Sequence, residues 1–459
     1  MKDLLYEPLP QIGQNPRTVL NDCRDKIIAN AIRIGNPRFL GWILASGTII
    51  GAFADGIAST LNQNVAVSGA GMATALELLV IDWIKEILAY DSNAAGILLS
   101  GGSMANLTAL ATARNVMADF DVETEGIQQD KKMVIYVSEE VHMSVPKAAN
   151  ILGIGINNIH RVKVDNVFRL DTNDLKAKII EDKNHNMFPF CVVATAGTVN
   201  TGAIDPLESI ADICQQYDLW FHVDAAYGGF AALSSHLKPL LNGITRADSV
   251  AIDPHKWLFI PFEAGCVLVK NPSHMIQTFS IDAPYVHMTN TTSISNENVD
   301  FSDYGLQLSR RFRALKIWMS LKQYGIEKYR RLIYQNINLT RYMAALVEES
   351  SDFEAASPVT LSVFCLRYFP EHLRQKYPEV DQLQEEKIEE YLNRLNRVIA
   401  EKMRTDQRAV LSSTALGDKY VLRACIVNFR TTKQDIRDIL TIVRELGRIT
   451  DERLRKENL

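Results

Sequence analysis

Short apolar runs alternate with longer amphipathic stretches through the middle of the chain. Five runs of four or five residues are bounded by polar residues or glycine, at 133–137, 191–195, 219–223, 249–252 and 266–269. Runs that are apolar at successive positions are typical of strands buried on both faces. Residues 105–117 fit a helix that begins at the glycines just before it. Strands that alternate with helices predict a mostly parallel sheet covered by helices.

The pattern changes after residue 325. Residues 360–369 and 420–429 are predicted strands, and two amphipathic helices stand beside them. Their apolar faces are Leu383, Ile388, Leu392, Leu395 and Ile399 in one helix, and Ile436, Ile439, Leu440, Val443 and Leu446 in the other. We therefore expect an N-terminal arm at 1–45, a large domain at 46–325 and a small α+β domain at 326–459. The arm is too short to fold alone, so it must pack on something.

Composition and charge limit the classes of molecule that this protein is expected to bind. Hydrophobic residues make up 47% of the 459 residues and charged residues 22%, which is ordinary for a globular chain. The net charge of −5 argues against a nucleic-acid partner or an anionic membrane. The most apolar stretch, 39–61, is interrupted by polar residues and glycine, so we expect no membrane span. A small-molecule partner is the prediction.

Six cysteines are scattered without a CxxC pair, and the N-terminus has no apolar run fit for a signal peptide. This usage favours reduced thiols over disulfides or a metal site. The sequence therefore predicts a cytoplasmic protein.

The segment 249–257, Ser-Val-Ala-Ile-Asp-Pro-His-Lys-Trp, places a lysine at the end of a predicted buried strand. The proline stops the strand. A charged lysine at the mouth of a parallel sheet is costly unless it is paired. A Schiff base between Lys256 and an aldehyde cofactor removes that cost and gives the amine a chemical role. A surface lysine is the alternative.

A second strand, at 219–223, leads directly to Asp224 and then to small residues. Ligands bind at this end of the strands in open α/β sheets. A buried carboxylate there can keep a pyridine nitrogen protonated, so that the ring accepts electrons. Ala226 is small enough to lie flat against such a ring. An N-cap of the following helix is the alternative role for Asp224.

Two further features fit the same cofactor. Gly102 and Ser103 lie in a glycine-rich turn that begins a helix, where backbone N–H groups suit a phosphate, although such a turn also serves as a simple N-cap. The glycines at 69 and 71 and at 153 and 155 lack the third glycine of a dinucleotide site. His142 follows the strand at 133–137 and could stack on a planar ring, or it could be a structural histidine.

Together these residues resemble the pyridoxal-phosphate group II amino-acid decarboxylases, the family of aromatic-L-amino-acid, histidine and glutamate decarboxylases. The likeness extends from Asn36-Pro-Arg-Phe39 to Lys419-Tyr-Val-Leu-Arg423, and its most specific parts are the motifs at 222–226 and 254–257. It implies the fold type I aminotransferase-like architecture, with a mostly parallel seven-stranded sheet sandwiched by helices. It also implies a homodimer with active sites at the subunit boundary.

The resemblance assigns roles to residues. It implies Lys256 as the Schiff-base lysine of pyridoxal 5′-phosphate, Asp224 on the pyridine nitrogen, and Ala226 and His142 on the two ring faces. His142 would also lie near the substrate carboxylate. The phosphate contacts would be Gly102, Ser103 and His255.

Residues 279–286 resemble the mobile catalytic loop of the family, and Tyr285 falls on its tyrosine. In these enzymes that tyrosine helps to protonate the substrate α-carbon after carbon dioxide leaves. Related aldehyde synthases have phenylalanine there, or asparagine at the histidine position. Because this chain has Tyr285 and His142, we expect an amine product. The polar stretch 289–298 behind the loop suits a lid.

Three positions depart from the animal enzymes. Asp253 stands where they have asparagine near the phosphate, and an additional acid there is unfavourable unless it is hydrogen-bonded away. Val199 replaces a threonine of the cofactor pocket. Leu44 replaces a threonine near the substrate ring, which weakens the case for a catechol substrate.

Substrate and reaction stay open between several alternatives. Leu44 and the small residues 68–70 favour an aromatic amino acid, whereas Arg38 suggests pairing with an acidic one. An aminotransferase, with Arg423 on the substrate carboxylate, or a carbon–carbon lyase is the first rival. A catalytically silent binding protein is the second. The sequence favours decarboxylation of an L-amino acid, aromatic before glutamate or aspartate.

Overall fold

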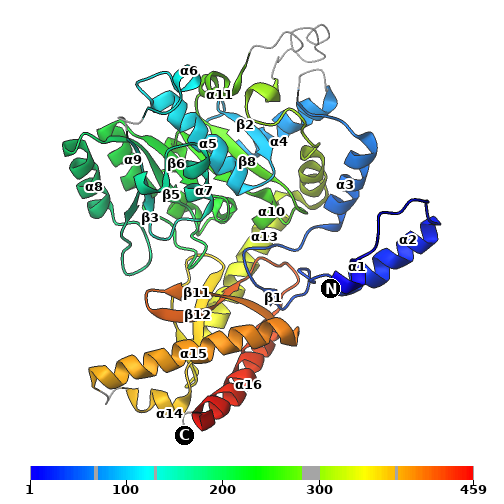
Figure 1. The fold of residues 1–459 in the computed structure, drawn as a ribbon, viewed down its shortest axis with the longest axis vertical. Coiled ribbons are helices and arrows are strands. Elements are labelled where there is room, and N and C mark those ends of the chain that lie inside the picture. The colour runs from blue at the N-terminus through cyan, green and yellow to red at the C-terminus, as the bar shows by residue number, and fades with distance from the viewer. Residues whose placement is uncertain (1, 67–70, 129–131, 282–299, 378–380, 458–459) are drawn as a thin grey trace.

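The computed structural model describes residues 2–66, 71–128, 132–281, 300–377 and 381–457. Figure 1 shows a large α/β body, a smaller C-terminal domain below it, and an N-terminal segment that extends to one side. The longest helix, α13 (Ala314–Glu348), connects the two bodies. It is kinked at Gly325, where φ is 66° and ψ is 156°.

The large body is built on a seven-stranded sheet with the order β2-β8-β7-β6-β5-β3-β4. All neighbouring pairs are parallel except those of β8, which runs antiparallel to β2 and to β7. The mostly parallel, seven-stranded prediction is confirmed. The strands are β2 (Ala95–Leu99), β3 (Met133–Ser138), β4 (Ile159–Val162), β5 (Phe188–Thr195), β6 (Trp220–Asp224), β7 (Ser249–Ile252) and β8 (Gly265–Val269).

The five strands predicted from apolar runs are all present, with ends that differ by up to three residues. Every residue of β3, β6, β7 and β8 is buried, as expected for strands covered on both faces. The sequence analysis missed β2 and the edge strand β4, in which only Val162 is buried.

Helices pack on this sheet, and the hydrophobic core of the large body lies between them and the strands. Helix α5 (Gly102–Met117) contacts β6, β7 and β8, whereas α8 (Thr172–Asn184) and α9 (Leu207–Tyr217) pack on β5. The predicted helix at 105–117 therefore begins three residues earlier, directly at the second glycine of the turn. Helix α4 (Met72–Leu88) contacts β2, and α7 (Ser144–Ile151) lies against α5.

The C-terminal domain has its own sheet, in the order β1-β11-β12-β10-β9, and its own hydrophobic core. The strands are β1 (Phe39–Leu40), β9 (Phe353–Ala355), β10 (Val363–Tyr368), β11 (Val410–Leu416) and β12 (Lys419–Cys425). The two predicted helices are present as α15 (Gln382–Asp406) and α16 (Lys433–Glu457). Strand β1 pairs in parallel with β11, so the chain at residues 39 and 40 packs on this domain.

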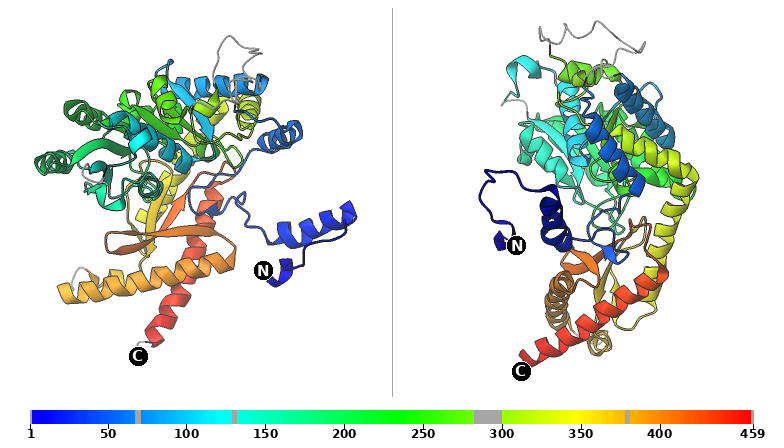
Figure 2. Two further views of the ribbon diagram at one scale, coloured as in Figure 1. Left: turned by 45° about the horizontal axis from the view of Figure 1, so that its top comes forward. Right: turned by 90° about the vertical axis from the view of Figure 1, so that its right-hand side faces the viewer.

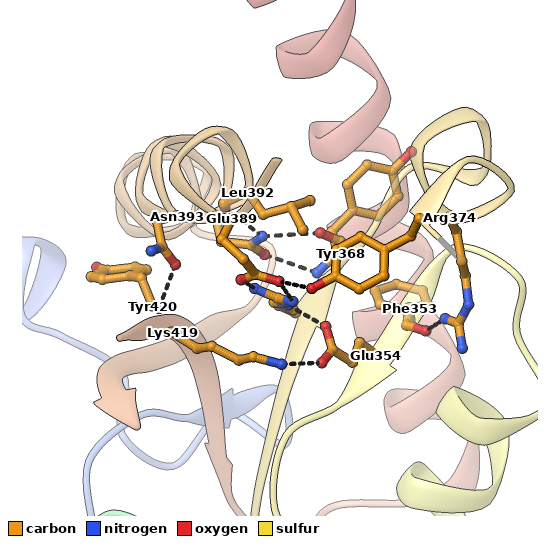
Figure 3. Close-up of polar contacts among 12 residues, drawn as sticks. Phe353, Glu354, Tyr368, Arg374, Glu389, Leu392, Asn393, Lys419 and Tyr420 are labelled. Carbon is orange, nitrogen blue, oxygen red and sulfur yellow. Dashed lines mark hydrogen bonds and ion pairs between the residues drawn. The ribbon is translucent and has the colours of Figure 1, made fainter. Parts of the chain in front are cut away.

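Polar contacts join the outer elements of this domain (Figure 3). The Glu354 carboxylate accepts a hydrogen bond from Lys419 Nζ at 2.9 Å. The Asn393 side chain accepts one from the Tyr420 backbone N–H at 2.7 Å, which ties α15 to β12. The Arg374 guanidinium donates to the Phe353 carbonyl. These bonds fix the helices against the sheet edge.

Before β1 the chain forms short helices that stand apart from the body in Figure 1 and in the left view of Figure 2. They are α1 (Lys2–Leu5), α2 (Pro16–Asp22), η1 (Cys23–Ile27) and η2 (Ile28–Asn30). No buried residue is found in α2, η1 or η2. No helix among the described residues combines the length and the apolar character that crossing a membrane requires.

Candidate active site

The carboxyl ends of the central strands and the first turn of α5 surround one cavity of about 310 Å³. Asp224 is the last residue of β6, Thr195 ends β5, and Asp253 follows β7 directly. Seven of the eight predicted site residues line this cavity, namely Gly102, Ser103, His142, Asp224, Ala226, His255 and Lys256. The eighth, Tyr285, lies outside the described residues, as do residues 68–70 and the lid predicted at 289–298.

The first turn of α5 forms one wall with exposed backbone. A Cβ added to Gly102 would lie 2.9 Å from Ala226 Cβ and 3.0 Å from Asp253 Oδ2, so no larger residue fits there. Gly101 has a φ of 152°, which disfavours other residues at the start of the helix. The unpaired N–H groups of a 16-residue helix meet the cavity at this point. Such a wall suits a phosphate group.

Lys256 enters the cavity from the short helix α10 (Pro254–Trp257). Its Nζ lies 3.0 Å from Asp253 Oδ2. The neighbouring His255 places Nε2 at 3.5 Å from the same oxygen. The Ala264 N–H donates to His255 Nδ1, so the ring proton is on Nε2. Burial lowers the pKa of His255.

The Asp224 carboxylate is held by two donors. The Ala226 N–H donates to Oδ1 at 3.1 Å, and Asn106 Nδ2 donates to Oδ2 at 2.8 Å. Only 5% of the surface of Asp224 is exposed, and the two donors fix its carboxylate at the cavity wall. Its free lone pairs can accept a hydrogen bond from a protonated group of a ligand. This is the interaction expected with a protonated pyridine nitrogen.

Asn106 connects Asp224 to a buried hydrogen-bond chain that the sequence analysis missed. His222 Nε2 donates to Asn106 Oδ1 at 3.0 Å, because the Asn106 nitrogen is already used as a donor. His222 Nδ1 therefore accepts from the Ser249 hydroxyl at 2.8 Å. That hydroxyl in turn accepts from Trp220 Nε1 at 2.8 Å. Burial lowers the pKa of His222 to about 4, so the ring is neutral at pH 7.

A second branch leads from Asn106 to the predicted stacking histidine. Asn106 Nδ2 also donates to Ser144 Oγ at 2.8 Å, which leaves the Ser144 hydroxyl proton for His142 Nδ1 at 2.8 Å. The proton of His142 is then on Nε2. Burial lowers the pKa of His142, so this ring is also neutral. One amide thus sets the orientation of both Asp224 and His142.

The spacing of these residues in the sequence indicated part of this hydrogen-bond chain. His222 and Asp224 are two apart on one strand and therefore share a face. Asn106 is four residues after Gly102, which puts both on the same face of α5. The contact between the two elements is a tertiary feature.

Two buried polar atoms at the cavity have no hydrogen-bond partner among the described residues, Thr195 Oγ1 and Asp253 Oδ1. Buried polar groups are normally satisfied, so their presence beside a cavity indicates that a polar ligand belongs there. A phosphate wall, a lysine amine and a fixed carboxylate in the same cavity fit pyridoxal 5′-phosphate.

Two arginines that the sequence analysis offered for the substrate are engaged elsewhere. Arg38 pairs with Asp435 and Asp438 on α16, so its suggested role toward an acidic side chain is wrong for this structure. Arg423 donates to the Val199 carbonyl and to Ser412 Oγ. Neither arginine lines the cavity, although Val199 itself does.

Leu44 is half-buried and is not among the residues that line the cavity. Its predicted place near a substrate ring therefore stays a prediction.

Comparison with known proteins agrees with this chemistry. The pyridoxal-dependent decarboxylase conserved domain matches residues 1–369. The chain is 35% identical to the aromatic-L-amino-acid decarboxylase of Bacillus atrophaeus over 449 residues, which cover 97% of this chain and 88% of that protein.

Among solved structures, mouse CSAD superimposes with a TM-score of 0.90 at 28% identity and covers 97% of this chain and 91% of its own. Tryptophan decarboxylase of Catharanthus roseus in complex with L-tryptophan gives a TM-score of 0.85 at 25% identity, covering 98% and 91%. The fold, the enzyme class and the cofactor predicted from the sequence are confirmed, and decarboxylation is favoured over the aminotransferase and lyase alternatives. The chain belongs to the pyridoxal-dependent decarboxylase family, whose members work with pyridoxal 5′-phosphate.

Proposed function

We propose that this protein removes carbon dioxide from an aromatic L-amino acid and releases the corresponding amine. The observation that supports it most is the position of Lys256 and Asp224 on the wall of one cavity, beside the first turn of α5. When bound, pyridoxal 5′-phosphate supplies a protonated ring that accepts the electron pair left by the departing carboxylate.

The protein residues divide the work around that ring. Lys256 would provide the amine that holds the aldehyde, and Asp224 would keep the proton on the ring nitrogen. Ala226 and His142 would cover the two ring faces. His142, with its proton on Nε2, can donate to the substrate carboxylate and orient it, because Ser144 occupies Nδ1. Gly102 and Ser103 at the helix terminus, together with His255, would hold the phosphate.

Tyr285 is proposed to return a proton to the α-carbon, which yields the amine. For Tyr285→Phe we expect less amine and more aldehyde and ammonia, measured by chromatography of the products. An unchanged product ratio would remove Tyr285 from the mechanism.

The choice of an aromatic substrate rests on charge. Lys256 is the one lysine among the described residues that line the cavity, and no arginine joins it there. An acidic side chain would therefore find no second cation among the described residues of this chain that line the cavity, and Arg38 is paired on α16. The decarboxylase of Bacillus atrophaeus is named for aromatic L-amino acids, which agrees. A screen of carbon dioxide release across the common L-amino acids tests the choice, and preference for glutamate or aspartate would refute it.

A homodimer with shared active sites is part of the proposal. On α3 (Ile49–Leu61) four apolar side chains spaced by four residues are exposed by 45 to 66%, which gives one apolar stripe. They are Ile49, Phe53, Ile57 and Leu61. The arm before β1 also exposes apolar side chains, such as Tyr6 at 90%. Apolar surface of this extent is typical of a subunit interface.

Phe53→Glu tests the dimer. We expect it to shift the protein to monomers in analytical ultracentrifugation and to lower activity. Leu383→Glu, at an exposed apolar position of α15, is the matched control and should leave the assembly unchanged. A wild-type protein that sediments as a monomer would contradict the proposal.

The cofactor assignment is tested by the visible spectrum. The purified protein should show the absorbance of a Schiff base with pyridoxal phosphate, and Lys256→Ala should abolish it. Persistence of the band in Lys256→Ala would contradict the role of Lys256.

We also propose the three-part division at residues 45 and 325, and a cytoplasmic location, with which the six free thiols agree.

A further inference from the structure

Lys256 is carried by a helix that is too short to hold itself in place. Helix α10 has four residues, and a single helical turn is unstable alone, because it fixes several residues for one hydrogen bond. Side-chain contacts of α10 must therefore set the direction in which Lys256 enters the cavity. This direction matters under the proposed function, on which the inference rests, because there the Lys256 amine holds the cofactor aldehyde.

The residues on both sides of Lys256 are fixed by hydrogen bonds. His255 Nδ1 accepts the Ala264 N–H at 3.2 Å, which ties α10 to the segment before β8. The Trp257 side chain is fully buried, and its Nε1–H donates to Asn336 Oδ1 at 3.1 Å. Asn336 lies on α13, beyond the kink of that helix. Neither Trp257 nor Asn336 is among the described residues that line the cavity.

The Trp257 indole also stacks on Tyr227, with ring centroids 5.1 Å apart and an interplanar angle of 26°. Tyr227 directly follows Ala226, which would cover one face of the cofactor ring. The Tyr227 hydroxyl lies 2.7 Å from Ser362 Oγ and accepts the Ser362 N–H at 2.9 Å. Ser362 directly precedes β10 of the C-terminal domain. The two stacked rings therefore join the segments that carry Ala226 and Lys256, and each ring has its polar end bound outside the large sheet.

Burial makes these hydrogen bonds specific. Trp257, Tyr227, Ser362 and Asn336 are each at most 2% exposed. Polar groups at such positions cost free energy unless they are paired, and here the indole N–H and the phenol are both paired. A hydrogen bond depends on direction, whereas an apolar contact does not. The bond to Asn336 therefore fixes the rotation of the indole and, through it, the single turn of α10.

We propose that Asn336 is a positioning residue for Lys256. By accepting the Trp257 N–H, it holds α10 so that the lysine amine meets the aldehyde of the cofactor, and the two join with loss of one water. Asn336 itself contacts neither the ring nor the phosphate in the proposed function. Its effect should therefore be limited to the bond that Lys256 forms.

Two ligands separate the lysine from the rest of the site. Pyridoxal phosphate has the aldehyde that reacts with an amine, whereas pyridoxine phosphate has an alcohol in its place and forms no Schiff base. Asn336→Leu leaves the Trp257 N–H buried without its acceptor. We expect the Kd for pyridoxal phosphate to rise about tenfold, the size of one buried hydrogen bond, and the Kd for pyridoxine phosphate to stay unchanged. Both are measured by calorimetric titration of cofactor-free protein. Equal weakening of both ligands, or of neither, would overturn the proposal.

Asn336 also donates to the Asn428 carbonyl at 3.2 Å, so a double variant is needed to separate its two bonds. Trp257→Phe keeps an aromatic ring beside Tyr227 but removes the N–H. Alone it should raise the Kd for pyridoxal phosphate to a similar degree, so the test does not depend on the folding of one variant. In this background Asn336→Leu should have no further effect. A second rise as large as the first would overturn the proposal.

Asn396→Leu is the control for a general loss of stability. Asn396 is fully buried in the C-terminal domain and bonds to backbone groups of Tyr368. It should lower the unfolding free energy to a similar extent, measured with urea, and leave both Kd values unchanged. Weakening of pyridoxal phosphate binding alone by this variant too would overturn the special role of Asn336.

Visible circular dichroism reports the placement of the bound cofactor directly. Pyridoxal phosphate is achiral and gains ellipticity only from its fixed position in the protein. We expect Asn336→Leu to change the ellipticity per unit of Schiff-base absorbance, a ratio that does not depend on how much cofactor is bound. An unchanged ratio would overturn the proposal. A wild type without Schiff-base absorbance would instead refute the proposed function, and the inference with it.

Discussion

Replacement of Asn106 by leucine tests the hydrogen-bond chain behind the cofactor site. Asn106→Leu keeps the approximate volume of the side chain but removes its bonds to Asp224, Ser144 and His222. The His222 N–H is left buried without an acceptor, which costs about 1–3 kcal/mol. The Asp224 carboxylate loses a charged hydrogen bond, worth about 1.5–3 kcal/mol. We therefore expect a loss of about 2.5–6 kcal/mol of unfolding free energy.

The functional part of the prediction concerns cofactor affinity. With one of its two donors gone, Asp224 is no longer fixed toward the ring nitrogen. If the lost 1.5–3 kcal/mol comes from binding, the Kd for pyridoxal phosphate rises by about 10- to 150-fold. The affinity is measured by absorbance titration of cofactor-free protein, and the stability by urea unfolding.

Asn396→Leu is the matched control. Asn396 is also fully buried and makes three bonds to backbone groups of Tyr368 and Leu392, but it lies in the C-terminal domain. It should lower stability to a similar extent and leave the Kd unchanged. The reasoning is refuted if both variants bind pyridoxal phosphate as the wild type does, or if both weaken it equally.

Two further predictions concern the same region. Gly102→Ala should weaken pyridoxal phosphate binding at least tenfold, because the added Cβ would lie 2.9 Å from Ala226 Cβ; an unchanged Kd in the absorbance titration would contradict the close packing. His222 should make the protein sensitive to acid. Unfolded histidine accepts a proton near pH 6.5, whereas burial lowers the pKa of folded His222 to about 4. The unfolding free energy should therefore fall by about 3 kcal/mol from this group between pH 6.5 and pH 4. Urea unfolding of His222→Gln at pH 7 and pH 4.5 should show a smaller fall than the wild type, and equal falls would disprove the assignment.

Local sequence patterns predicted most of the large sheet because burial on both faces requires continuous apolar runs. Strand β4 contains His160 and Arg161 and lies at the sheet edge, so it has no such run. The antiparallel direction of β8 was also beyond prediction, since direction depends on how the chain returns to the sheet. Strand β1 is two residues long, and its pairing with β11 spans some 370 residues of sequence.

A site residue could be predicted where the short segment around it was enough to indicate its role. Lys256 after a strand and Asp224 at the end of another both have a local signature. Arg38 shows what could not be predicted. Its ion-pair partners lie on α16, about 400 residues away in the sequence, and the local motif does not indicate them. Asn106 shows it as well, since its role depends on three other elements.

The sequence by itself determined which chemical groups stand at the ends of the strands, and in what order. Burial and turn formation depend on neighbouring residues, so these features can be derived from short segments. Only the tertiary structure decided which groups touch. A hydrogen bond needs its partner within about 3 Å, and Asn106, Ser144, His222 and Asp253 acquire their partners only when α5, α7, β6 and α10 pack around one cavity.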